Sequence, residues 1–181
     1  MAMIGHNRRP VLTGSGWRRH CWQVARENLL PVLPIEVVRT RVRRAKDLGL
    51  DDKTYAGVRA TTGHDLVAFL FSSNALRLMP TGRIPDPEAA KLATSRDCGR
   101  IALAQCIAPT VILLENPATV TATGSAPLPC ASFQDQVAAL RRALGGVPGD
   151  RVLLVTSAPW EMEWVDTGRL AGMLPAARYF A

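Results

Sequence analysis

The pattern of apolar and polar positions predicts two consecutive helices ahead of the most apolar part of the chain. From residue 35 onward, apolar side chains recur at intervals of three and four, as on one face of an α-helix, and basic side chains fill most of the remaining surface. Gly49 is suited to ending this helix, because glycine enters the left-handed conformation without steric cost. Asp51 can then cap a second helix, which runs through Thr62 and ends at Gly63.

Residues 65–78 form the most apolar stretch and predict a buried element at the centre of the fold. A helix drawn over them is apolar nearly all round, so we expect a third helix, capped by Asp65. The run AFLFSS fits a buried strand equally well, and the sequence leaves helix and strand both open. In either case we expect Phe69, Leu70 and Phe71 to lie in the core against the apolar run at residues 152–155.

After residue 80 the chain alternates between short apolar runs and amphipathic segments. Residues 100–106, 111–115 and 151–156 predict strands, and residues 133–144 predict an amphipathic helix closed by glycines. Weaker signals predict a helix over 86–93, a long loop over 116–132 and a last helix from 160 towards 173. This order predicts an α/β fold, with α+β as the alternative, in which a helical N-terminal front packs on a small, mostly parallel sheet.

Composition divides the chain into three predicted regions. Residues 1–16 contain glycines and proline with almost no periodicity, which is typical of a mobile arm. Residues 17–79 form a basic helical region, and residues 80–181 form a small α/β region that makes one compact unit with it. The opening Met-Ile-Gly-His-Asn is similar to the starts of assorted small alphaproteobacterial proteins, some of them phage-related. That resemblance suggests a bacterial or phage source and implies no activity.

The overall composition is that of a globular protein. Of the 181 residues, 48% are hydrophobic and 20% are charged. No apolar run approaches the roughly 20 residues that span a bilayer, and the first residues lack the apolar core of a secretory signal. We therefore expect a cytoplasmic protein without membrane contact, whose four cysteines are free thiols.

The positive charge is concentrated in the first third of the chain. Residues 1–60 contain twelve Arg or Lys and five Asp or Glu side chains, whereas residues 61–181 contain ten of each. The whole net charge of +7 therefore belongs to the first segment. Such asymmetry favours a polyanionic partner, either nucleic acid or an acidic protein surface, and the alternative is a solvated helix face that serves solubility.

Five basic side chains of the first predicted helix form the centre of this candidate surface. Arg39, Arg43 and Lys46 fall at positions i, i+4 and i+7, so they should share one exposed face, which Arg41 and Arg44 flank. If this face binds a partner, none of the five should be held in an internal ion pair.

The two predicted helices also resemble the DNA-binding helix-turn-helix pattern. The resemblance covers residues 41–60 and is carried by these positions: Ala45, Leu48, Gly49, Leu50, Tyr55 and Val58. It implies a recognition helix over about residues 52–62 that presents Lys53, Thr54 and Arg59 to base edges or phosphates. Asp51 and Asp52 depart from the pattern, because they place negative charge where phosphates would lie. An ordinary helical hairpin would use the same glycine and the same packing.

Motifs for catalysis, metals and cofactors are absent from the sequence. There is no G-x-S-x-G elbow, no close spacing of cysteines and histidines, and no glycine-rich loop between a strand and a helix. Cys98, with Arg96 and Arg100 nearby, is a possible thiolate, although a lone cysteine is more often structural. We therefore expect no cofactor and no metal, and the sequence favours a non-enzymatic binding or regulatory protein without excluding an enzyme.

One further candidate site follows the clearest predicted strand. Ser157, Trp160 and Glu161 come directly after residues 151–156, and open α/β sheets place ligand groups where their strands end. This position predicts, as the alternative function, a small α/β enzyme or nucleotide-binding protein. A simpler explanation for the acidic residues is that they stabilise the first turn of a following helix.

Overall fold

The computed structural model describes residues 33–181. The chain divides into a first unit, Met1–Val38, and a second unit, Arg39–Ala181, and all strands of the described residues belong to the second. The predicted arm over residues 1–16, and the predicted basic region as far as residue 32, lie outside the described residues. The account below concerns the second unit and the helix that leads into it.

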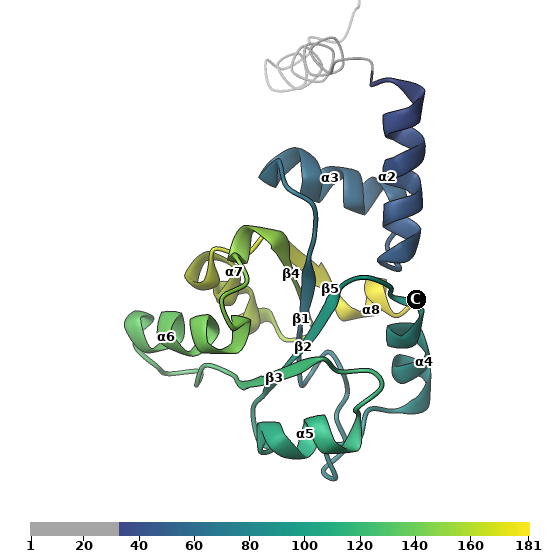
Figure 1. Cartoon of the computed structure of the whole chain (residues 1–181). Helices are drawn as coiled ribbons and strands as arrows, with labels where there is room; N and C mark the ends of the chain where they lie inside the picture. Colours follow the sequence, from purple (N-terminus) through teal and green to yellow (C-terminus); the bar gives the residue numbers. More distant parts are fainter. Residues whose placement is uncertain (1–32) are drawn as a thin grey trace, which may run out of the picture. The chain divides into compact units, whose positions relative to one another are not determined.

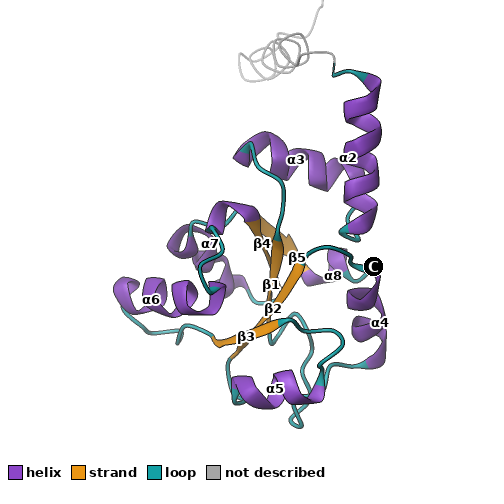
Figure 2. Ribbon diagram, viewed as in Figure 1, coloured by secondary structure: helices purple, strands orange, loops and turns teal. Residues whose placement is uncertain are grey.

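A parallel sheet of five strands forms the framework of the second unit, and its order is β3-β2-β1-β4-β5 (Figures 1 and 2). The strands are β1 (Ala68–Ser72), β2 (Gly99–Ala104), β3 (Ala122–Ser125), β4 (Val152–Thr156) and β5 (Gly172–Pro175). Every neighbouring pair is parallel, so the α/β prediction is confirmed. Because the chain builds outward from β1 in one direction and then in the other, the connections reverse between β1 and β4.

Helices cover both faces of the sheet. The connecting helices are α4 (Asp86–Thr94), α5 (Pro109–Glu115), α6 (Phe133–Leu144) and α7 (Glu163–Gly168), with the 3-10 segments η1 (Gly149–Arg151) and η2 (Pro159–Met162) and the final α8 (Ala176–Tyr179). Figure 2 shows α6 and α7 on one side of the sheet and α4 and α8 on the other. Two separate apolar clusters result, one on each face.

The central strand β1 joins these clusters. Phe69 and Phe71 point to the face that carries α4 and α8, where each ring lies 5.3 Å from the ring of Tyr179. Leu70 points to the opposite face and packs beside Leu154. The prediction that residues 69–71 lie in the core against the strand at residues 152–155 is confirmed.

The predicted helix over residues 65–78 is wrong, because Ala68–Ser72 is a strand. All of its residues are buried, and it lies between β2 and β4, so its backbone groups are paired on both edges. A strand covered on both faces is apolar at nearly every position, which gives it the same sequence pattern as a fully buried helix. Asp65 does not cap a helix, and its carboxylate instead accepts from Arg44 and Tyr55.

The other errors concern short elements. Residues 111–115 belong to helix α5, which Pro109 opens at its first turn. Strand β3 lies within the predicted loop over residues 116–132. The predicted last helix is divided into η2, α7 and strand β5. Each of these segments is short, and the pattern of apolar positions in a short run does not separate a strand from a helix.

The two helices at the front of the chain agree with their predicted boundaries. Helix α2 (Ile35–Asp47) is followed by Gly49 with φ of 70°. Helix α3 (Asp52–Thr62) is capped by Asp51, whose carboxylate accepts from the N–H of Thr54 at 2.8 Å, and it ends at Gly63 with φ of 75°. Local capping chemistry therefore accounts for this part of the fold.

Candidate functional site

The reversal of connections between β1 and β4 marks the carboxyl edge of the sheet as the first place to look for a site. Ligands of open α/β folds bind outside the carboxyl ends of the strands, at the point where the strand order reverses. At this edge, β1 is followed by Ser73 and Asn74, β2 by Gln105, and β4 by Ser157. The sequence predicted a site after β4 alone.

A buried carboxylate ties these strand ends together. Oε1 of Glu161 accepts hydrogen bonds from the side-chain amides of Asn74, at 2.8 Å, and Gln105, at 2.7 Å. Its Oε2 accepts from the hydroxyl of Thr156 and from the N–H of Ala158, the latter at 3.3 Å. Glu161 is fully buried. We call this arrangement the Glu161 knot, and because all four neighbours donate, it positions the loops after β1, β2 and β4 and leaves no oxygen for a ligand.

One hollow beside the knot, the β1–β4 hollow, has a volume of about 390 Å³. Its walls include small apolar residues of α8, the ring of Phe180 and Ala75 after β1. The polar side chains that line it belong to Arg77, Glu88 and Ser157. The predicted site residue Ser157 therefore lines this hollow, whereas Glu161 is buried and contacts the residues on either side of Ser157, Thr156 and Ala158.

A second hollow, of about 330 Å³, lies beyond the carboxyl ends of β2 and β3. Gln105 lines it and also donates to Glu161, so the knot touches its wall. Asp135 and Arg142 of α6 supply its charged groups.

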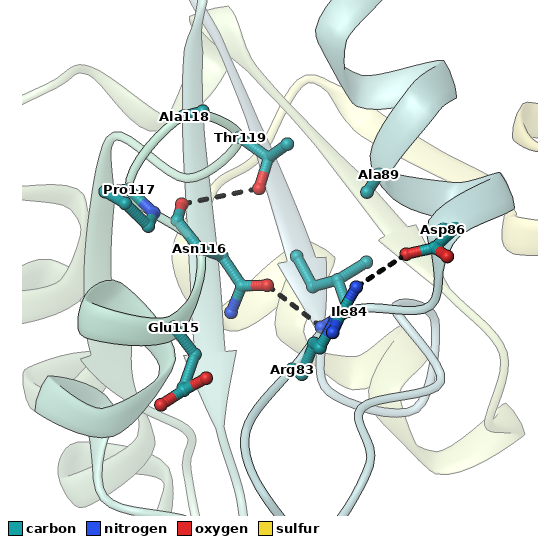
Figure 3. A pocket seen from close by; sticks show the side chains of 9 residues that line it. All are labelled: Arg83, Ile84, Asp86, Ala89, Glu115, Asn116, Pro117, Ala118 and Thr119. Atoms are coloured by element: carbon teal, nitrogen blue, oxygen red, sulfur yellow. Dashed lines mark hydrogen bonds and ion pairs between the residues drawn. The ribbon is translucent and has the colours of Figure 1, made fainter.

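A third hollow, of about 290 Å³, lies between the start of α4 and the end of α5 (Figure 3). The amide of Asn116 donates to the carbonyls of Gly82 and Ile112 and accepts from the N–H of Ile84, all within 2.9 Å. Arg83 pairs with Asp86 at 3.0 Å on the rim (Figure 3). The side-chain amide of Asn116 therefore makes its hydrogen bonds within the protein and anchors the segment before α4, which is a structural role.

Trp160 is separated from the other two residues of the predicted strand-end site. Its ring packs edge-on against the ring of Trp164, with the centroids 5.4 Å apart. It does not line any of the three hollows above. The structure thus brings Ser157 and Glu161 to the carboxyl edge, and it adds Asn74, Arg77, Glu88 and Gln105, which the sequence analysis missed.

The predicted basic surface is placed at the opposite, amino edge of the sheet, where Arg44 is engaged internally. Its guanidinium donates to the carboxylate of Asp65 at 3.0 Å and to the carbonyls of Leu66, at 3.0 Å, and Asp97, at 3.2 Å. These carbonyls precede β1 and β2. The expectation that none of the five basic side chains of α2 is held in an internal ion pair is therefore wrong, because Arg44 fastens α2 to the sheet.

Two of the three predicted recognition residues of α3 are also engaged. Arg59 donates to the hydroxyl of Tyr55 at 3.2 Å and lies 3.9 Å from the carboxylate of Asp65. The hydroxyl of Thr54 donates to Asp51 and accepts from Arg178 at 2.7 Å. The hydrogen bonds from Thr54 hold the pKa of Asp51 below its usual value, with a smaller contribution from Arg178.

The remaining basic side chains of α2 and α3 differ in their exposure to solvent. Arg39, Arg43, Lys46 and Lys53 are exposed, as expected, whereas Arg41 is half-buried. Lys53 is thus the only one of the three predicted recognition residues that is both exposed and outside the hydrogen bonds described above. The two helices have the predicted boundaries, whereas the helix-turn-helix assignment stays a prediction, and Lys53 is the recognition residue of α3 that is left for a partner.

Cys98 is not activated by its basic neighbours. Burial raises the pKa of its thiol, and the charges of Arg100 and Arg44 offset this only in part. Within residues 33–181, no three His, Cys, Asp or Glu side chains are grouped as a metal site would require. In the same range, no helix has the length and apolar character needed to cross a membrane.

Comparisons with family models, with curated proteins and with solved structures found no match to this chain. The site must therefore be interpreted from its own geometry.

Proposed function

We propose that this protein binds a small polar molecule in the β1–β4 hollow. The observation that carries the proposal is the Glu161 knot, in which one buried carboxylate holds the ends of β1, β2 and β4 beside a hollow at the reversal point of the sheet. A buried charge with four donors is costly to assemble, and its effect is to hold loops that would otherwise move. Rigid strand ends around a hollow are what a preformed ligand site requires.

The geometry favours recognition by side chains over recognition of a phosphate by backbone. In phosphate-binding folds a glycine-rich loop follows the first strand and opens directly into a helix. Here β1 is followed by Ser73 and Asn74, and α4 begins only at Asp86. The polar groups in the hollow are instead the side chains of Arg77, Glu88 and Ser157. This supports a small hydrogen-bonding ligand rather than a nucleotide held by its phosphates.

The proposal is tested by filling the hollow. Ala177 is exposed on α8 and lines the hollow, so Ala177→Trp should occupy the space without disturbing the core. A panel of small polar metabolites is screened by ligand-observed NMR against the wild-type protein. Any binder should be lost in Ala177→Trp and kept in Ala60→Trp, which places the same side chain on the exposed surface of α3. Equal binding to both variants would place the site elsewhere, and a panel without any binder would contradict the proposal.

A second candidate function rests on the exposed basic side chains at the amino edge. We propose that Arg43, Lys46 and Lys53 attract nucleic acid, since the net charge of +7 is confined to residues 1–60 and these three are exposed. Each phosphate contact should contribute about −0.9 to the slope of log K against log salt on duplex DNA. Reversing all three to Glu should abolish binding at about 50 mM salt, and it should change stability little because exposed charges contribute about 0–1 kcal/mol each.

A charge-matched control separates a specific surface from net charge. Arg141, Arg151 and Arg169 are exposed and lie outside α2 and α3, so reversing them changes the net charge by the same amount. Binding should survive in this control. Failure of the wild-type protein to bind DNA or RNA at low salt would remove this candidate, and an acidic protein would become the partner to seek.

A further inference from the structure

The β1–β4 hollow contains a buried carboxylate with few partners. Glu88 lies in the first turn of α4 and is only 6% exposed. Its one ion pair within the described residues is with Arg77, whose Nη1 lies 3.5 Å from Oε1. In contrast to Glu161, Glu88 accepts no hydrogen bond in this part of the chain. A buried carboxylate normally uses both oxygens as acceptors, so Glu88 keeps acceptor capacity directed at the hollow.

Arg77 supplies the opposite charge from an unusual backbone position. The turn after β1 ends with hydrogen bonds from Leu78 N–H to the carbonyl of Ser73 and from Arg77 N–H to that of Asn74, which places Arg77 where a helix normally ends in glycine. Its φ is 49°, in the left-handed region that disfavours side chains. The side chain itself is 76% exposed, so it remains available to a ligand.

We infer that the hollow takes a small zwitterion, namely a free amino acid with an apolar side chain. The ligand's ammonium group would donate to Glu88, and its carboxylate would accept from the guanidinium of Arg77 and the hydroxyl of Ser157. The four charges then alternate in sign, so each protein group keeps its present partner and gains a second. Charge-assisted hydrogen bonds of this kind are the strongest available to a small ligand.

Size and lining restrict the ligand further. A volume of about 390 Å³ lies near the lower end of the range of small-molecule sites. Ala75, Ala176 and Phe180 form the apolar part of the wall, which fits an aliphatic or aromatic side chain. This inference rests on the proposed ligand-binding function and adds the class of ligand to it.

The charge requirement is tested with matched ligands. L-leucine and L-phenylalanine carry both charges, N-acetyl-L-leucine lacks the cation, and L-leucinol lacks the carboxylate. Binding to the full chain is measured by ligand-observed NMR and titration calorimetry. We expect both amino acids to bind, and each singly charged analogue to bind about tenfold or more weakly, because it leaves either Glu88 or Arg77 without its new charged partner. Equal affinity for leucine and its analogues would overturn the inference.

The role of Arg77 is tested by Arg77→Gly against the matched variant Arg169→Gly. Arg169 has φ of 48° at the end of α7, so both substitutions relieve the same backbone conformation, and only the first removes a group from the hollow. Both variants should melt close to the wild-type temperature. Arg77→Gly should bind leucine at least about tenfold more weakly, and Arg169→Gly should bind it normally.

The outcomes distinguish this inference from the function on which it rests. If Arg77→Gly binds leucine as well as Arg169→Gly does, the zwitterion inference is wrong. If amino acids do not bind, but another small molecule binds to the wild-type protein and not to Ala177→Trp, the hollow is a ligand site for a different class of molecule. If nothing binds, both are wrong. Glu88→Gln should reproduce the loss seen in Arg77→Gly, and normal leucine binding by a folded Glu88→Gln protein would also overturn the inference.

Discussion

Substituting Glu161 by glutamine tests whether the knot holds the carboxyl edge together. The variant keeps the shape of the side chain and removes its charge. The glutamine oxygen can take the place of Oε1 and still accept from Asn74 and Gln105, at present 2.8 and 2.7 Å away. The new NH₂ group must then face the hydroxyl of Thr156 and the N–H of Ala158, both of which now donate. The hydroxyl can turn to accept, whereas the Ala158 N–H cannot.

The magnitude follows from these contacts. A partly buried N–H left without an acceptor costs about 1–3 kcal/mol, and loss of the charge weakens the remaining hydrogen bonds by a further ~1 kcal/mol in total. We therefore expect Glu161→Gln to lower the free energy of unfolding by about 2–4 kcal/mol, a large part of the ~5–15 kcal/mol of a typical domain. With an m value of about 2 kcal/mol/M, the midpoint of urea unfolding should fall by about 1–2 M.

Urea unfolding followed by circular dichroism measures this change, and Glu115→Gln is the control. Glu115 is exposed at the end of α5, so its substitution should change the unfolding free energy by less than about 0.5 kcal/mol. A double-mutant cycle with Asn74→Ala should show a coupling of about 0.5–3 kcal/mol, because the two side chains share a hydrogen bond. If Glu161→Gln unfolds at the same urea concentration as Glu115→Gln, the knot does not stabilise this edge.

Further predictions concern other parts of the fold. Arg44→Ala should lower the free energy of unfolding by about 1–3 kcal/mol in urea titrations, because it removes hydrogen bonds to one carboxylate and two carbonyls. Arg43 is exposed, so the control Arg43→Ala should lower the free energy of unfolding by less than about 0.5 kcal/mol. Gly124→Ala would place the new Cβ 2.5 Å from Cβ and 2.8 Å from Cα of Ala143 in α6, so the Tm of this variant should fall sharply. Gly57→Ala is the matched control, because the new Cβ would meet no neighbouring group within 4 Å. This second substitution should raise the Tm, since alanine has a helix propensity about 0.5–1 kcal/mol better than that of glycine. Burial raises the pKa of Tyr179 to about 12 from an ordinary value of about 10, so the folded state favours the protonated phenol. Stability should therefore fall as pH rises from about 10 to 12, by up to about 1.4 kcal/mol per pH unit from this group, and Tyr179→Phe should flatten that slope in alkaline unfolding curves.

Local chemistry in the sequence determined the helices with distinct ends. Helix α3 is defined by Asp51 at its start and Gly63 at its end, and α6 runs over the predicted residues 133–144 before Gly145, whose φ is 58°. A cap and a left-handed glycine act within a few residues of each other, so the sequence alone carries the signal. The same is true of β4, whose apolar run is long enough to be recognised.

Elements that depend on distant partners were not determined in this way. Residues 68–72 are a strand because β2 and β4 pair with both of their backbone edges. The sequence of the segment does not show that these two partners exist. The edge strands β3 and β5 each have 4 residues and pair with only one neighbour. Such segments have a weak β-strand propensity of their own, and they adopt the strand conformation because they pair with the neighbouring strand of the sheet.

The candidate site shows the same division. The sequence placed Ser157 and Glu161 correctly at the end of a strand, because a strand end is a local feature. It could not show that Asn74, 87 positions away, and Gln105, 56 positions away, donate to the same carboxylate oxygen. Parallel strands bring their carboxyl ends to one edge whatever their separation along the chain, so the order of the sheet decides which polar side chains meet there.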